Sequence, residues 1–227
     1  MSILTQKTVK RKVSLEGVGI HTGLKTNISI LPAHPNSGII FKRIDIKKNN
    51  MVIPTYNNVI DATLCTTISN DFGIKVSTIE HLMGAFYGLG IDNAIVELNS
   101  QEVPIMDGSA KEFVKLILEA GFQNSEAPIK LIKIEKEVEV IEGNKKISIN
   151  RSNVSLDIDF EIVYKNSLIK SQRNKVSVFE DNLKDIYNSR TFCLFEDLEK
   201  LKVLGLGKGG SLENALVVKD NLLMNEE

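Results

Sequence analysis

The chain has 227 residues, of which 42% are hydrophobic and 25% are charged, and its 28 basic and 29 acidic residues give a net charge of -1. This length and apolar content suffice for a folded globular protein with one large core or two smaller ones. The balanced charge, the absence of tryptophan and an aromatic content of 6% argue against nucleic-acid binding, so we expect a small-molecule partner.

No apolar stretch of the sequence reaches the roughly 18 to 20 residues that a membrane span requires, and the first residues lack the apolar region of a signal peptide. We therefore expect a cytoplasmic protein without stable membrane insertion, and a monomer. Cys65 and Cys193 lie far apart with no CxxC spacing, which predicts two free thiols instead of a disulfide or a structural zinc site.

The first half begins with extended, β-branched segments that are separated by Gly, Pro and Asn clusters. These predicted strands cover 7–15, 24–33, 37–45 and 59–68. A helix is predicted from Ser77 to about Leu89, because its apolar residues recur at i, i+3, i+4 and i+7. A strand at 93–100, a turn at 102–110 and a second helix at 111–121 complete this half.

The polar stretch FQNSEAPIK (122–130) contains Pro128 and has no periodicity, so it is predicted to link two domains, 1–124 and 129–227. The second half repeats the order of elements. Its predicted strands are 130–140, 145–152, 155–164, 174–179 and 214–220, and its helices are about 180–187 and 194–203. The predicted fold class is α+β: two similar domains, each a β-sheet with helices on one face, and a cleft between them. The second domain is expected to be incomplete, because no final helix follows its last strand.

The stretch STIEHLMGAF (77–86) allows two interpretations of Glu80. Ser77 and Glu80 fit a capping box, in which the glutamate bonds back to the start of its own helix and has a structural role only. Alternatively, Glu80 and His81 form a chemical pair. An imidazole can ligate a metal, and an adjacent carboxylate can activate the water bound to it.

The face of this helix that carries His81 bears on the choice. At about 100° per residue, His81 points away from the apolar stripe, and its predicted neighbours on that face are Gly84, Ala85 and Gly88. Glycines are costly in a helix, so a face this small suits close approach by another part of the protein. A surface histidine remains the alternative.

Five stretches of the sequence resemble one known family in the same order along the chain. They are GVGIHTG (17–23), TLCTTI (63–68), STIEHLMGAFYGLGIDNAIVELN (77–99), EVPIMDGSA (102–110) and SRTFCLFEDLEKLKVLGLGKGGSLENALVV (189–218). The family is that of the zinc-dependent UDP-3-O-acyl-N-acetylglucosamine deacetylases (the LpxC family), which commit sugar nucleotides to lipid A synthesis. The resemblance extends over essentially the whole chain.

The resemblance implies a hydrolase that removes the N-acetyl group from UDP-3-O-(3-hydroxyacyl)-N-acetylglucosamine, with a Zn²⁺ cofactor held by two histidines and an aspartate. His81 matches the first zinc ligand, Glu80 the general base, and Thr191 the hydroxyl that stabilises the oxyanion. The other matching positions are expected to bind substrate, beside the active site, at the sugar or along the acyl chain. They are Leu64, Cys65, Phe192, Leu198, Gly210, Ser211, Ala215 and Val217.

The sequence departs from the family pattern at the remaining zinc ligands. In the family these come from an H-x-x-x-D helix, and the general acid is a later histidine in a Gly-His-Asn stretch, and neither is present. His34 lies in a proline-bounded turn, and no spacing brings it to His81. The glycine-rich setting of His21 matches the family, so His21 is either a supporting residue near the cleft or an ordinary turn histidine. We therefore expect a truncated chain that is inactive alone. The alternatives are a non-catalytic sugar-nucleotide or acyl-binding module and a fragment unable to fold fully.

Overall fold

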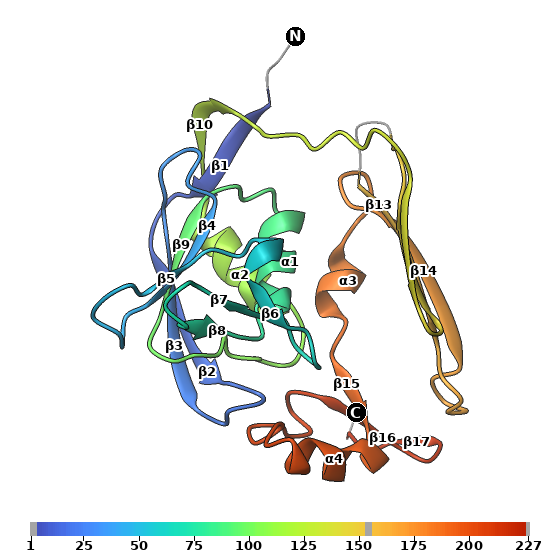
Figure 1. Cartoon of the computed structure of the whole chain (residues 1–227). Helices are drawn as coiled ribbons and strands as arrows, with labels where there is room; N and C mark the ends of the chain where they lie inside the picture. The colour runs from blue at the N-terminus through green and yellow to red at the C-terminus, as the bar shows by residue number, and fades with distance from the viewer. Residues whose placement is uncertain (1–3, 153–155, 226–227) are drawn as a thin grey trace.

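The computed structural model describes residues 4–152 and 156–225, which form a mixed α+β structure as the sequence predicts (Figure 1). In the first half the strands are β1 Thr5–Val9, β2 Val13–Val18, β3 Lys25–Leu31, β4 Ile39–Arg43, β5 Met51–Val52, β6 Val59–Asp61, β7 Thr67–Ser69, β8 Lys75–Val76 and β9 Ala94–Leu98. The helices are α1 Glu80–Gly88 and α2 Lys111–Ala120, with a 3₁₀ turn at Tyr56–Asn58.

The central sheet of this half has the strand order β2-β3-β9-β4-β5, with β4 and β9 parallel and the other pairs antiparallel. The strands predicted at 7–15 and 59–68 are each divided in two. The first divides because β1 pairs with β10 Phe122–Pro128 whereas β2 pairs with β3, so its two parts belong to different sheets.

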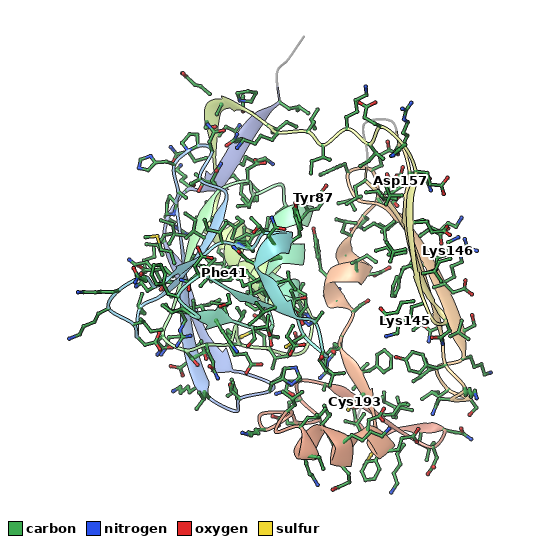
Figure 2. The ribbon with its side chains drawn as sticks, viewed as in Figure 1. Phe41, Tyr87, Lys145, Lys146, Asp157 and Cys193 are labelled. Atoms are coloured by element: carbon green, nitrogen blue, oxygen red, sulfur yellow. The ribbon has the colours of Figure 1, made fainter. Side chains whose placement is uncertain are left out.

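The core of the first half lies between this sheet and the two helices. Leu82 and Phe86 of α1 and Phe113 of α2 belong to the same buried cluster as Ile28 and Phe41 of the sheet (Figure 2). Fully burying side chains of this size contributes about 1.5 to 3 kcal/mol each. The helical periodicity of 77–89 thus identified the core-facing side of α1 correctly. Because this side is packed in the core, the side of the helix that carries His81 has a fixed orientation.

The predicted linker at 122–130 is wrong for most of its length, because Phe122–Pro128 form the strand β10. It pairs antiparallel with β1, with Val9 opposite Phe122 and Lys7 opposite Asn124. The pairing depends on backbone groups and not on an apolar pattern, which explains why the polar sequence gave no strand signal. The division into domains at 124 and 129 stays a prediction, and its boundary lies in this strand.

The second half contains two hairpins and a small sheet. Its elements are β11 Val138–Glu142, β12 Lys145–Ile149, β13 Asp157–Val163, β14 Ser171–Ser177, α3 Lys184–Asn188, β15 Phe192–Leu194, α4 Leu198–Val203, β16 Leu216–Lys219 and β17 Leu222–Leu223, with a 3₁₀ turn at Phe195–Asp197. Position 155, where one strand was predicted to start, lies outside the described residues. In the parts of the chain that the structure describes, these strands do not join in one sheet as the sequence predicted, because β11 pairs with β12 and β13 with β14.

Helix α3 is shorter than the predicted helix at 180–187, because acidic and amide side chains bind the backbone before it. Asp181 accepts a hydrogen bond from the amide of Ser177, and Asn182 accepts one from the amide of Lys184. The helix lies between the first half and the two hairpins (Figure 1). Across the described residues, none of the helices combines the length and the apolar character needed to cross a membrane.

Candidate functional site

Glu80 is the first residue of α1, but it does not cap that helix. The capping box predicted from Ser77 and Glu80 is wrong: the N-cap is Ile79, and the Ser77 hydroxyl donates instead to the carbonyl of Gln101 at 3.2 Å. The Glu80 carboxylate accepts a hydrogen bond from the amide of Thr66 at 3.0 Å. Glu80 therefore faces the segment that carries Cys65 rather than the start of its own helix.

His81 follows on the same helical turn and is half-buried. Burial lowers the pKa of its imidazole below the ordinary value, although the negative charges of Glu80 and Asp107 act in the opposite direction. The imidazole is therefore neutral near pH 7, which is the form that ligates a metal ion. Asp107 thus belongs to the surroundings of the Glu80–His81 pair.

The small-residue face of α1 is only partly as predicted. Gly88 lies against the second half, where the hydroxyl of Tyr187 on α3 would be 2.2 Å from a Cβ at this position. Gly84 has open space around it. Ala85, which was predicted on this face, is fully buried in the core, so that prediction was wrong. The apolar side of α1 that packs in the core is therefore wider than the sequence pattern predicted, and it includes Ala85.

The turn that contains Asp107 brings Thr191 to the same place. The Asp107 carboxylate accepts hydrogen bonds from the amide and the hydroxyl of Ser109, and the Ser109 hydroxyl accepts one from the amide of Lys111 at the start of α2. The amide of Thr191 donates to the carbonyl of Gly108 at 2.8 Å. Thr191 is therefore held beside the turn whose carboxylate acts on His81.

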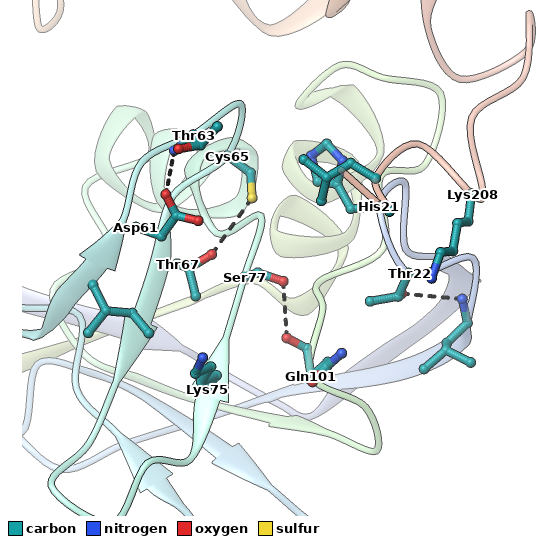
Figure 3. A pocket seen from close by; sticks show the side chains of 14 residues that line it. His21, Thr22, Asp61, Thr63, Cys65, Thr67, Lys75, Ser77, Gln101 and Lys208 are labelled. Atoms are coloured by element: carbon teal, nitrogen blue, oxygen red, sulfur yellow. Dashed lines mark hydrogen bonds between the residues drawn. The ribbon is translucent and has the colours of Figure 1, made fainter. Parts of the chain in front are cut away.

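A cavity of about 550 Å³ opens next to this region, between the turn after β2 and the segment 60–67 (Figure 3). It is lined by His21, Thr22, Leu24, Ile60, Asp61, Thr63, Cys65, Thr67, Lys75, Ser77, Gln101, Gly205, Leu206 and Lys208. Residues from four separate parts of the sequence, 21–24, 60–77, Gln101 and 205–208, thus meet in one cavity. His21 lines this cavity, and its supporting role stays a prediction.

His21 and Cys65 shift each other's protonation inside this cavity. The side-chain interaction with Cys65 raises the pKa of His21 more than burial lowers it, and Glu102 and Glu80 raise it further. Burial raises the pKa of the Cys65 thiol, but hydrogen bonding to His21, Thr67 and Thr78 and the charge of His21 together outweigh burial, so the pKa of the thiol is below the ordinary value. The Nδ1 atom of His21 is buried without a hydrogen-bond partner among the described residues.

The glycine-rich stretch GLGKGGS (205–211) lies against the turn that carries His21. The amide of Gly209 donates to the carbonyl of Ile20 at 3.0 Å, and the amide of Lys208 to that of His21 at 3.3 Å. A Cβ on Gly209 would lie 2.3 Å from the carbonyl oxygen of Gly19. The glycine is therefore required for close approach of two backbone segments.

Glu102 is the residue of this region that the sequence analysis missed. Its side chain is fully buried, and it accepts hydrogen bonds from His21, Thr22 and Thr78. The stretch was interpreted as a turn before α2, and a charged residue in a predicted turn gives no signal of burial. The one available signal is an acidic residue followed by the apolar run VPI, which has the pattern of a buried segment.

The predicted substrate-binding residues other than Cys65 do not line this cavity. Leu64 is 62% exposed with a φ of 65°, and Phe192 packs edge-on against Tyr164 with ring centroids 5.5 Å apart. The others differ in burial: Leu198 is half-buried, Gly210 and Ser211 are exposed, and Ala215 and Val217 are buried. Their substrate-binding roles stay predictions.

The residues present do not fit a complete zinc site. His81 supplies one neutral imidazole, but among residues 4–152 and 156–225 no group of three His, Cys, Asp or Glu side chains could hold a metal ion. A catalytic zinc typically takes three protein ligands and one water molecule.

Comparison with known proteins gives consistent results over the whole chain. A family model described as UDP-3-O-acyl N-acetylglycosamine deacetylase (LpxC) matches residues 6–227. Relatives named UDP-3-O-acyl-N-acetylglucosamine deacetylase include those of Teredinibacter turnerae (43% identical; 99% of this chain and 75% of the relative), Myxococcus xanthus (41%; 100% and 72%) and Haemophilus ducreyi (37%; 99% and 74%).

Proposed function

This chain belongs to the UDP-3-O-acyl N-acetylglycosamine deacetylase family, and from that membership we propose that it acts on UDP-3-O-(3-hydroxyacyl)-N-acetylglucosamine in lipid A biosynthesis. The reaction is hydrolysis of the acetamide, which gives acetate and the free amine. The observation that carries the proposal is the position of Glu80 and His81. Both lie at the start of α1, the charge of Asp107 acts on His81, and Glu80 is not used as a helix cap.

We assign the base role to Glu80. Its carboxylate takes a proton from the water molecule that attacks the acetamide carbonyl. The carbonyl oxygen becomes negatively charged in the tetrahedral intermediate, and the hydroxyl of Thr191 donates a hydrogen bond to it. The leaving nitrogen must gain a proton before the C–N bond breaks, and the resemblance gives that role to a histidine without a counterpart in this sequence.

Zn²⁺ remains the proposed cofactor, with His81 as one ligand. The neutral imidazole of His81 supports this assignment. Bound zinc would supply Lewis-acid activation of the carbonyl and of water. Among the described residues no three potential ligands lie together, so the other ligands of the zinc ion stay unassigned.

The substitution Glu80→Gln tests the catalytic assignment. The amide oxygen of glutamine can still accept the hydrogen bond from Thr66, so the fold is preserved while the base is lost. If the unaltered chain, with zinc supplied, releases acetate from the acylated UDP-N-acetylglucosamine, Glu80→Gln is expected to lower kcat at least about 100-fold. A decrease of only a few-fold would remove Glu80 from the base role.

Zinc content is measured on the same preparations. His81→Ala is expected to lower zinc binding, whereas His34→Ala, a matched change at an exposed histidine, is expected to leave it unchanged. If the unaltered chain releases no acetate above a blank with zinc alone, this chain is not a deacetylase by itself. The second candidate function is a binding module for the sugar nucleotide or its acyl chain, and it is favoured by the lack of a three-ligand group among residues 4–152 and 156–225. Titration with UDP-N-acetylglucosamine would detect such binding.

A further inference from the structure

Glu102 is a fully buried carboxylate that the proposed reaction does not use, and it accepts four hydrogen bonds. Its Oε1 accepts from the amide of His21 and from the hydroxyl of Thr78, both at 2.9 Å. Its Oε2 accepts from the amide of Thr22 at 2.7 Å and from the hydroxyl of Thr22 at 2.6 Å. A buried carboxylate is tolerated where such donors replace its water shell, so these contacts form one unit.

The turn at 19–22 is shaped around this carboxylate. Gly19 is buried, and a Cβ at that position would lie 2.2 Å from the Oε2 atom of Glu102. The turn is closed by a hydrogen bond from the amide of Gly23 to the carbonyl of Gly19 at 2.9 Å. Only glycine leaves room for the carboxylate, and the bound turn then places the imidazole of His21 in the cavity beside Cys65 (Figure 3).

Glu102 also contacts Thr78, the residue at which the chain bends into α1. Thr78 has a φ of 57°, a left-handed conformation that is rare for a β-branched residue, and it directly precedes the N-cap Ile79. Ser77 pairs with the Glu102 segment through hydrogen bonds of 2.9 Å to the carbonyl of Gln101 and 3.0 Å from the amide of Val103. The bond to the Thr78 hydroxyl thus fixes the bend that precedes α1 and its first residue, Glu80.

We propose that Glu102 is a positioning residue, whose carboxylate joins the turn at 19–22 to Thr78 and so holds His21 and the start of α1 with Glu80 in a fixed relation. Without this joint the turn and the first residues of α1 would move independently. The effect on catalysis rests on the proposed function, since misplacing reacting groups by about 1 Å can cost about 100-fold in rate. The joint itself is a property of the fold.

Three substitutions separate positioning from other roles. Glu102→Gln keeps the shape of the side chain but turns a donor toward groups that are themselves donors. Glu102→Asp keeps the charge but shortens the side chain by one methylene. Gly19→Ala leaves Glu102 intact and places a methyl group in its space. Glu97→Gln is the control, because Glu97 on β9 is a partly buried carboxylate paired with Lys42 at 2.9 Å, away from the cleft.

The readouts are the NMR signals of the backbone amides of His21 and Thr22, together with kcat and KM for acetate release. In all three variants both amides are expected to shift, and kcat is expected to fall about 10- to 100-fold with a smaller change in KM. Glu97→Gln is expected to change neither. All proteins are compared below their melting temperatures, so that loss of fold is recognised separately.

Two results would overturn the proposal. Unchanged amide signals in Glu102→Gln and Gly19→Ala would show that the joint does not exist. A kcat of Glu102→Asp within twofold of that of the unaltered chain would show that the negative charge of residue 102 affects catalysis and the exact position of its carboxylate does not. If the unaltered chain released no acetate, the proposed function would fail, and the amide signals would still decide whether Glu102 holds the turn.

Discussion

Cys65 and Cys193 are both partly buried, yet their surroundings act on them in opposite directions. Burial raises the pKa of the Cys193 thiol, and the charge of Asp197 adds to that effect. Burial acts in the same way on Cys65, but its hydrogen bonds and the charge of His21 together outweigh burial and lower the pKa of that thiol. Because the thiolate is the nucleophile, the two cysteines should differ in reactivity.

We expect Cys65 to be alkylated by iodoacetamide faster than Cys193 at pH 7 to 8, by about tenfold for each pKa unit that separates them. The sign follows from the pKa directions: a lowered pKa leaves more thiolate at a given pH, so the ratio of rates should decline as the pH rises above the ordinary thiol pKa. Mass spectrometry of each cysteine peptide measures both rates in one sample. His21→Gln should slow Cys65 alone, and equal rates in the unaltered protein would contradict the prediction.

At the scale of one helix, α1 uses its small residues in different ways. Gly88 permits contact with Tyr187 of α3. Among the described residues, by contrast, no heavy atom lies within 4 Å of the position that a Cβ on Gly84 would take. Tyr87, which directly precedes Gly88, points out of the first half (Figure 2). Its ring packs against that of Phe179 at a tilt of 42°, with ring centroids 5.8 Å apart. The C-terminal end of α1 is therefore the part that packs against the second half of the chain.

These two glycines make a matched pair for a stability measurement. Gly84→Ala is expected to raise the free energy of unfolding by about 0.5 to 1 kcal/mol, because alanine loses less conformational entropy in a helix and meets nothing. Gly88→Ala should give no such gain, because its Cβ would lie 2.2 Å from the Tyr187 hydroxyl. Denaturant titration compares the two.

Adding Tyr187→Phe to Gly88→Ala should recover part of the stability, because it removes the oxygen atom that the new methyl group meets. Equal stabilisation by the two single alanine substitutions would show that α1 and α3 do not pack as the structure has them.

For the whole molecule, the main asymmetry is between a packed first half and a second half with open apolar faces. The hairpin β11–β12 presents Val140 and Ile147 directly opposite each other, with 59% and 71% of these residues exposed. On β13 the residue Phe160 is 63% exposed, while Asp159 on the other face pairs with Arg173 and Lys175. Apolar faces of this kind on two-stranded hairpins make little contribution to stability without a covering layer.

We expect these faces to bind the hydrophobic dye ANS and to promote association as the protein concentration rises. Ile147→Lys should reduce both ANS fluorescence and the concentration dependence of sedimentation. Ser148→Lys is the matched control, because it adds the same charge one residue later on the opposite face of β12. Equal fluorescence from both variants and from the unaltered chain would show that the hairpin faces are covered in solution.

Local patterns were sufficient for the elements with strong periodicity. The core stripe of α1, the strand at 93–100 and the turn that precedes α2 could all be predicted, because hydrophobic period and turn chemistry act over a few neighbouring residues. Short motifs in a fixed order likewise predicted the family, which the match over residues 6–227 confirms. Both kinds of information are contained in the chain before it folds.

The tertiary structure decided what depends on contacts between distant residues. Whether Glu80 caps its helix depends on Thr66, fourteen residues before it, and the polar stretch 122–128 is a strand only because β1 lies beside it. Glu102 became a buried joint because its donors come from a turn about eighty residues earlier. The free energy of a buried polar group is set by the partners that replace water, and the sequence alone does not reveal which residues the fold supplies as partners.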